Sequence, residues 1–205
     1  MHDERPVDRI LGQRWEEYAR RRLALTGQGH PGRDTVVELF GEPDPFEVVV
    51  APFDDRWPGI AGPAAPTRTD PDRLAAGMLD ALARAERARG DGSSGVLAQA
   101  GRSTDVPALA RRHDLPEPWE SDPAELSAVL RSWEERFGTR LVLLERERLI
   151  LSVAAPPSTT DAAQAVAAEN FAFAPDTITQ GDHETLRPYA AHEVLGRRMW
   201  SFWWD

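Results

Sequence analysis

The stretch SDPAELSAVLRSWEERFG, residues 121–138, carries the strongest structural signal in the sequence. Asp122 is a favourable N-cap, Pro123 suits the first helical position, and Gly138 is a common residue at a helix end. The apolar side chains between these caps repeat at helical spacing and share one face: Leu126, Val129, Leu130, Trp133 and Phe137. The stretch therefore predicts an amphipathic helix that packs on a core, with its tryptophan inside that core.

The residues after this helix predict a β-hairpin and two further helices. In TRLVLLERERLILSVA, residues 139–154, two apolar runs flank charged residues, which indicates two strands that turn near residues 146–148. After two prolines, Ser158 or Thr159 can begin an alanine-rich helix whose small side chains allow close packing against a sheet. Thr185 can cap a later helix that has Pro188 in its first turn, where a missing N–H costs little.

The last six residues, WSFWWD, are expected to form a terminal strand. In a strand, alternate side chains share a face, so Trp200, Phe202 and Trp204 would point into the core. Ser201, Trp203 and Asp205 would point to the other side. Trp203 is either covered by a helix, which is the usual fate of a large aromatic side chain, or exposed beside Asp205, where it can stack on a ligand.

These elements predict an α+β fold for residues 95–205, together with a strand at residues 95–100 and a brief helix over residues 105–112. We expect an antiparallel or mixed sheet with helices packed on one face, similar to a ferredoxin-like split βαβ unit. The glycine- and serine-rich RGDGSSG, residues 89–95, marks a boundary before this region.

Residues 1–92 are expected to form an N-terminal α/β region. Its predicted elements are a helix over residues 7–25, a hairpin and a second helix that starts at Asp70 and Pro71. The hairpin is predicted from the β-branched runs DTVVELF, residues 34–40, and FEVVVA, residues 46–51. A loop rich in proline, glycine and alanine precedes the second helix. The region either extends the sheet or forms a second layer.

Composition narrows the classes of function. The chain has 205 residues and a net charge of -10, which disfavours nucleic acid and anionic membrane surfaces as partners. It contains neither cysteine nor lysine, which excludes disulfides, thiolate zinc sites and lysine-based catalysis. The charged first residues and the lack of a long apolar run predict a cytoplasmic protein without a membrane segment.

One polar cluster near the C-terminus is a candidate site: Asp176, Gln180, Asp182, His183, Glu184, His192 and Glu193. Two histidines with carboxylates can bind a metal, but the spacing is neither H-x-x-x-H nor H-E-x-x-H, so we predict no metal site and no cofactor. Acidic residues before a helix also suit its dipole without any ligand. The candidate binding residues are Asp176, Gln180, His183, Trp203 and Asp205, and no catalytic residue is assigned.

Several of these motifs also carry a family resemblance. The stretches DPAELSAVLRSWEERFG, LILSVAAPP, FAFAPD and WSFWWD, in this order, resemble a bacterial family known as domain of unknown function 4253. The resemblance covers residues 95–205. It implies a bacterial, soluble protein and no particular reaction.

Two classes of function follow from these observations. The first is a non-enzymatic binding module, similar to the small acidic immunity proteins, whose acidic surface attracts a basic protein partner. The second is a small-molecule-binding or hydrolytic domain that uses carboxylates and histidine near the terminal strand. The second requires Asp176 and His183 or His192 to converge in one pocket.

Overall fold

The computed structural model describes residues 6–26, 33–42, 44–89, 102–106, 119 and 122–204. The N-terminal part contains α1 (Pro6–Thr26), α2 (Arg33–Phe40), α3 (Phe46–Val49) and α4 (Pro71–Arg89). The 3₁₀ turn η1 (Ser103–Asp105) precedes α7 (Pro123–Phe137), β1 (Thr139–Leu144) and β2 (Arg148–Val153). Then come α8 (Thr160–Phe173), α9 (Asp176–Thr179), α10 (Leu186–Tyr189), the π-helical turn η2 (Ala190–Val194) and β3 (Met199–Trp203).

Helix α7 forms as the sequence predicts. The Asp122 carboxylate accepts hydrogen bonds from the backbone N–H groups of Ala124 and Glu125, at 3.0 and 3.3 Å. Gly138 ends the helix in the left-handed conformation, with φ of 62°. The predicted apolar face is buried, and Trp133 is fully enclosed. Both ends of the helix are therefore fixed by local sequence, and its orientation is fixed by the core.

We expect Gly138→Ala to lower the free energy of unfolding by about 1–2 kcal/mol, because a residue with a Cβ is disfavoured at positive φ. An added Cβ would also lie 3.1 Å from the Ala154 Cβ and 3.3 Å from the Pro71 Cγ. The matched control is Gly77→Ala within α4, where nothing lies within 4 Å of an added Cβ. That change should stabilise the chain by about 0.5–1 kcal/mol. Urea denaturation measures the free energy of unfolding of both variants. Equal changes in the two would contradict the special role assigned to Gly138.

The sheet is antiparallel, with strand order β1-β2-β3, so the predicted α+β class is confirmed. The hairpin β1–β2 turns at residues 145–147, close to the predicted position, and a bulge lies between Leu141 and Leu143. β3 pairs directly with β2, in a register that places Trp200 opposite Leu151 and Phe202 opposite Leu149.

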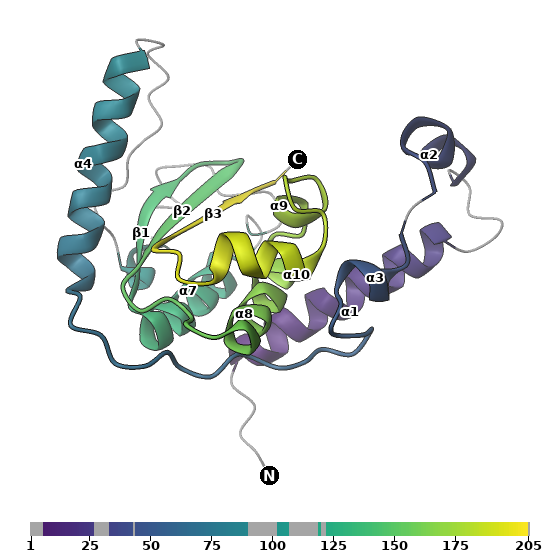
Figure 1. The fold of residues 1–205 in the computed structure, drawn as a ribbon, viewed down its shortest axis with the longest axis horizontal. Helices are drawn as coiled ribbons and strands as arrows, with labels where there is room; N and C mark the ends of the chain where they lie inside the picture. The colour runs from purple at the N-terminus through teal and green to yellow at the C-terminus, as the bar shows by residue number, and fades with distance from the viewer. Residues whose placement is uncertain are drawn as a thin grey trace.

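The connection from β2 to β3 explains why a split βαβ unit is not found among the described strands. Helix α8 leaves the end of β2, and the α9–α10–η2 segment brings the chain back to that same end (Figure 1). There the Val153 N–H donates to the Arg198 carbonyl at 2.8 Å, and the Gly196 N–H donates to the Pro157 carbonyl at 2.9 Å. A chain that returns to the end of β2 must pair antiparallel to it, whereas a single-helix crossover gives parallel strands.

Helices cover both faces of the sheet. The larger core lies on the face of α7 and α8, where it includes Trp200 and Phe202 of β3 and extends to α1. On the other face, α4 lies along β1 and β2 (Figure 1). A second, smaller apolar cluster lies between them. Helix α4 contributes Ala75, Met78, Leu79 and Leu82 to it, and the sheet contributes Val142, Leu143 and Ile150. The predicted layer of helices on one face is thus joined by α4 on the other.

The N-terminal helices pack against the C-terminal elements. Trp15 of α1 is fully buried and makes edge contacts with Phe46 of α3 and Phe171 of α8, at ring-centroid distances of 5.5 Å in both cases. The expected boundary at residues 90–95 lies outside the described residues, as does the predicted strand at residues 95–100. Of the predicted helix over residues 105–112, the described part shows η1 and one further helical residue, Val106.

The predicted hairpin at residues 34–51 is wrong, because both runs form helices, α2 and α3. In the second run, Phe46 and Val49 are buried while Val48 between them is half exposed, which is helical spacing rather than alternation. Pro45 immediately precedes this turn. The high β-branched content suggested strands, but the i, i+3 pattern and the contact of Phe46 with the core decide the local structure.

A buried ion pair joins α7, α8 and the loop before α4. The Arg136 guanidinium contacts the Glu169 carboxylate through two hydrogen bonds, of 2.7 and 2.6 Å, and both side chains are almost completely buried. Glu169 also accepts hydrogen bonds from the Ala61 backbone N–H at 2.7 Å and from the Trp133 indole at 2.8 Å. These groups come from three parts of the chain, α7, α8 and the loop before α4, so the ion pair ties the three together.

A second polar contact attaches α4 to the sheet. Arg140 of β1 donates to the Asp72 carboxylate in the first turn of α4, at 2.6 Å. This hydrogen bond holds the pKa of Asp72 below its usual value. Because Asp72 is largely exposed, the contact contributes little to stability and serves mainly to orient α4. Within the described residues, no helix is both long and apolar enough to cross a bilayer.

Candidate functional site

A pocket of about 350 Å³ lies between α9, the loop after it, η2 and the last strand. It contains two of the five predicted binding residues, His183 and Trp203. The residues that line it are Thr177, Gly181, Asp182, His183, Tyr189, Glu193, Ser201 and Trp203. We call this the C-terminal pocket.

Thr177 holds the floor of the C-terminal pocket against β3. Its hydroxyl accepts a hydrogen bond from the Trp203 backbone N–H at 2.9 Å and donates to the Trp203 carbonyl at 3.1 Å. These bonds satisfy backbone groups on the free edge of β3, which pairs on its other side with β2. A single side chain therefore fixes the position of Trp203 relative to α9.

The loop after α9 needs a glycine to turn into the pocket. At Gly181 an added Cβ would clash with the Thr177 carbonyl oxygen, so a side chain here would displace the loop. The Gly181 N–H donates to the Ile178 carbonyl at 3.2 Å. The next two residues, Asp182 and His183, are thereby directed to the pocket wall.

Two histidines stack at the rim of the pocket. The rings of His183 and His192 are 4.5 Å apart between centroids, with 18° between their planes. His183 Nε2 also lies 3.7 Å from a carboxylate oxygen of Glu193. His192 is exposed, and its carbonyl accepts a hydrogen bond from Arg197. The side chain of His183 thus has the His192 ring and the Glu193 carboxylate as neighbours.

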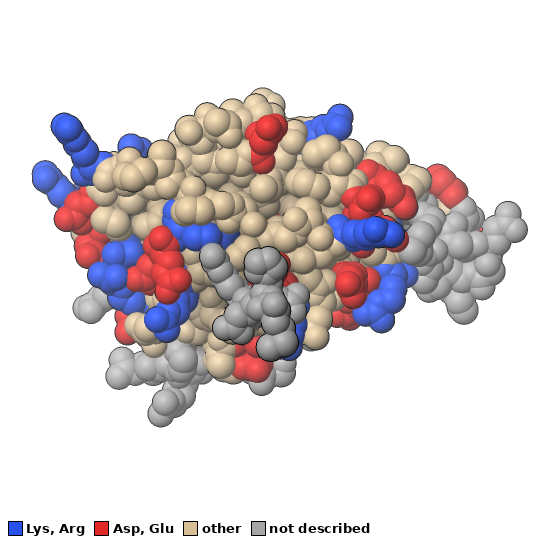
Figure 2. Space-filling model, turned by 90° about the horizontal axis from the view of Figure 1, so that it is seen from below, with Lys and Arg blue, Asp and Glu red and all other residues tan. Residues whose placement is uncertain are grey.

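The charge on the pocket wall is acidic. Asp182 and Glu193 are both exposed, and none of the described residues that line the pocket is an arginine. The face of the molecule in Figure 2 carries basic and acidic side chains side by side, with broad uncharged areas between them.

Trp203 is only partly covered. Its neighbours along the strand, Trp200 and Phe202, are buried in the core as predicted, and so is Trp204 after the strand. The side chain of Trp203 instead lines the pocket and is partly exposed. Helix α9 is bonded to the backbone of Trp203 through Thr177. An aromatic side chain is therefore available to an occupant of the pocket.

Tyr189 forms a rigid inner wall. It is buried, and its hydroxyl accepts a hydrogen bond from the Asn170 amide at 3.4 Å. Burial raises the pKa of Tyr189, and the hydrogen bond only partly opposes this effect. The phenol therefore remains neutral over the physiological range of pH.

Asp176 and Gln180 do not join this pocket. The Gln180 amide donates to the Asp176 carboxylate at 3.4 Å, one turn away along α9. Asp176 lines another cavity, of about 240 Å³, with Tyr18, Phe46 and Phe171. Burial, and secondarily the Asp176 charge, raises the pKa of Tyr18 to about 12. The fifth predicted residue, Asp205, lies outside the described residues.

Of the seven residues in the predicted polar cluster, the structure brings four together: Asp182, His183, His192 and Glu193. Sequence reasoning missed Thr177, Tyr189 and Ser201, because their roles depend on packing between α9, α10 and β3 rather than on spacing. Among the described residues, no group of three or more histidine, aspartate or glutamate side chains is placed to hold a metal ion.

The region that contains this pocket matches a known protein family. The sequence model of the family described as "Domain of unknown function (DUF4253)" matches residues 96–205, which include α7–α10, the whole sheet and every residue that lines the C-terminal pocket. A search of curated proteins gives no match, and a search of solved structures gives none either. Because the match spans more than half of the chain, the protein belongs to this family of domains of unknown function, DUF4253.

Proposed function

We propose that the protein is a non-enzymatic binding module that recognises a basic protein partner and holds one of the partner's arginine or lysine side chains in the C-terminal pocket. The observation that carries the proposal is the pairing of Asp182 and Glu193 with a partly exposed Trp203 in a pocket lined by no described arginine. Carboxylates attract a guanidinium or ammonium group, and the face of an indole ring binds a cation through its quadrupole.

The size and surroundings of the pocket suit a side chain rather than a large cofactor. Its volume of about 350 Å³ is at the lower end of ligand pockets. Thr177 and the buried Tyr189 keep its walls in place, so little ordering is required on binding. The net charge of -10 would accelerate encounter with a basic protein. A basic toxin, neutralised in the cytoplasm in the manner of immunity proteins, is one partner of this kind.

The hydrolytic alternative has less support. It required Asp176 to converge with a histidine, and Asp176 lines a different cavity from His183. The His183–Glu193 contact could orient a general base, but no serine or threonine with a base at hydrogen-bond distance is seen among the described residues of the pocket.

Partner capture tests the proposal with a charge-matched control. The intact chain, the double variant Asp182→Asn/Glu193→Gln and the control Glu38→Gln/Asp80→Asn are each immobilised and exposed to a lysate of the source cells. The control changes the net charge equally at exposed positions on α2 and α4. We expect a basic protein to be retained in stoichiometric amount by the intact chain and the control, and recovery by the pocket variant to fall about tenfold, the effect of losing 1.4 kcal/mol.

Quantitative mass spectrometry of the eluates gives the readout, with thermal unfolding to confirm that all three proteins are folded. Equal recovery of the partner by the pocket variant would contradict the assignment of the site. Absence of a stoichiometric basic protein from every eluate would contradict the function itself.

A further inference from the structure

The last strand leaves part of its free edge open to another chain. In the described sheet, β3 pairs with β2 on one side only. The Trp203 N–H and carbonyl point to the other side, because both bond the Thr177 hydroxyl of α9. In an antiparallel strand the backbone groups of alternate residues point to the same side. The N–H and carbonyl groups of Ser201 and Met199 therefore point to this edge as well.

Both of these residues lie at accessible positions. Ser201 is partly exposed and lines the C-terminal pocket, and Met199 is 45% exposed. Among the described residues, neither backbone is bonded to a group outside the sheet. Unpaired N–H and carbonyl groups along a strand edge are a template for another strand. Because α9 already covers Trp203 through Thr177, the template is limited to the first part of β3.

The charge beside this edge decides which chain suits it. Asp182 and Glu193 line the C-terminal pocket together with Ser201. A segment that places a basic side chain between these carboxylates enters the pocket where Ser201 forms its wall. A second copy of this chain is disfavoured, because pairing of two β3 edges would bring two acidic pockets together. A basic, extended segment of another protein has the complementary charge.

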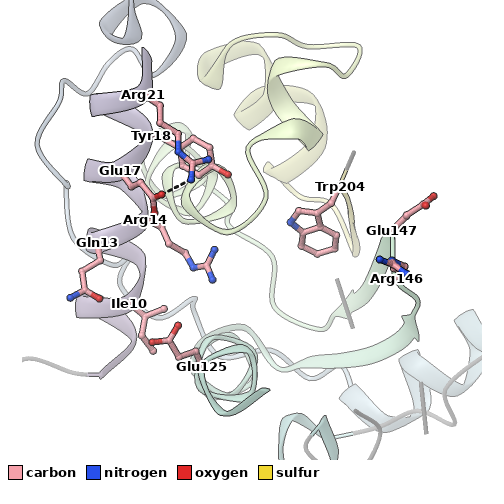
Figure 3. A pocket seen from close by; sticks show the side chains of 10 residues that line it. All are labelled: Ile10, Gln13, Arg14, Glu17, Tyr18, Arg21, Glu125, Arg146, Glu147 and Trp204. Carbon is pink, nitrogen blue, oxygen red and sulfur yellow. Dashed lines mark hydrogen bonds and ion pairs between the residues drawn. The ribbon is translucent and has the colours of Figure 1, made fainter. Parts of the chain in front are cut away.

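The larger cavity near the end of β3 does not have this preference. It has a volume of about 830 Å³ and lies between α1 and Trp204, the residue after β3 (Figure 3). The described residues that line it include three arginines and three glutamates, and Glu17 is bonded to Arg21. Because charges of both signs are present, this cavity does not favour a cation over an anion. The acidic wall beside Ser201 is the feature that selects a basic segment.

We propose that the partner presents its basic side chain on an extended segment, which pairs as a short additional strand with the β3 edge at Met199 and Ser201. This inference rests on the binding function proposed for the C-terminal pocket and adds the backbone form of the segment that the pocket recognises. Backbone hydrogen bonds supply affinity, and the pocket supplies the preference for a basic side chain. Alternate residues of a strand are about 6.7 Å apart, so these two positions can bond a segment of about three residues.

The test uses the peptide acetyl-Thr-Val-Arg-Val-Thr-amide and two methylated versions of it. One carries a methyl group on the backbone nitrogen of arginine, and the other carries it on the backbone nitrogen of the preceding valine. In a strand paired with β3, one of these N–H groups faces β3 and the other faces away. We expect at least tenfold weaker binding of one methylated peptide and nearly unchanged binding of the other. In the ¹⁵N-labelled chain, the Ser201 amide should shift and exchange more slowly with solvent when the parent peptide binds.

Variants of Ser201 test the same hydrogen bonds from the side of the protein. Ser201→Pro removes the N–H at the free edge and should weaken binding of the parent peptide at least fivefold. It should leave the pairing of β2 with β3 in place, because proline is tolerated on edge strands. The control Ser201→Ala keeps the N–H and should bind as the intact chain does. Thermal unfolding shows whether Ser201→Pro is folded, and if it is not, the methylated peptides decide.

Equal binding of the two methylated peptides, or an unchanged Ser201 amide when the parent peptide is bound, would overturn the strand pairing and leave the arginine pocket in place. No binding of the parent peptide at millimolar concentration would also overturn it. A Ser201 amide that shifts with protein concentration alone would overturn it by identifying a second copy as the occupant. Equal binding of a citrulline version, with the difference between the methylated peptides retained, would support the pairing but contradict the recognition of charge.

Discussion

Replacing Glu169 with alanine is expected to lower the free energy of unfolding by about 3–5 kcal/mol, a large part of the 5–15 kcal/mol typical of a domain. The variant leaves the Arg136 guanidinium buried without its counter-ion. It also leaves the Trp133 indole N–H and the Ala61 backbone N–H without an acceptor. Leaving a buried charge unpaired costs far more than the intact pair contributes, so the loss comes mainly from these orphaned groups.

A double-mutant cycle separates the charge from the packing. Arg136→Met/Glu169→Leu removes both charges and retains apolar volume, so we expect it to be more stable than Glu169→Ala, even though the two N–H groups stay unsatisfied. The cycle compares the intact chain, Arg136→Met, Glu169→Leu and the double variant, and urea denaturation gives the free energy of unfolding of each. Additive effects of the two single changes would contradict the coupled, buried pair described for α7 and α8.

Replacing Phe202 with alanine is expected to cost about 3–5 kcal/mol as well, because its side chain fills the centre of the aromatic core. Phe202 is fully buried, lies parallel to Trp133 at a centroid distance of 5.4 Å and makes an edge contact with Phe173 at 4.9 Å. The cavity left by the ring would separate the last strand from both α7 and α8. We therefore expect a lower free energy of unfolding and faster hydrogen exchange of the backbone amides of β3.

The neighbouring change Trp203→Ala is the matched control. It removes a larger ring from the same strand, but from the face that lines the C-terminal pocket. Its cost should be about 1 kcal/mol, because a partly exposed side chain buries less apolar area. Urea denaturation measures the free energy of unfolding of both variants. A greater loss of stability in Trp203→Ala than in Phe202→Ala would contradict the assignment of the core and pocket faces of β3.

The parts of the fold that local sequence controls were predictable. The caps at Asp122 and Gly138, the hairpin, the alanine-rich helix and the alternation in the terminal strand each depend on residues close together in the chain. The runs that form α2 and α3 were mistaken for strands because valine content is a weaker guide than the spacing of the side chains that reach the core.

Contacts between distant segments could not be predicted in the same way. In the sequence, Arg136 is an ordinary basic residue in the last turn of a helix, and Glu169 is one acid in an alanine-rich helix. Their pairing depends on how α7 and α8 cross. For the same reason the polar cluster indicated His183 correctly but not its separation from Asp176, which follows from the direction of the short helix α9. The pocket beside Trp203 likewise depends on how α9 packs against β3.

The most direct test of the binding function is the indole N–H resonance of Trp203 in the ¹⁵N-labelled chain, assigned with Trp203→Phe. The probes are the peptide acetyl-Gly-Arg-Gly-amide and its analogue with citrulline, which has nearly the same shape without the charge. We expect a saturable shift of the Trp203 resonance with the arginine peptide, little or none with the citrulline peptide, and loss of the shift in Asp182→Asn/Glu193→Gln. Equal responses to both peptides, or a Trp203 resonance that does not move, would contradict the binding function.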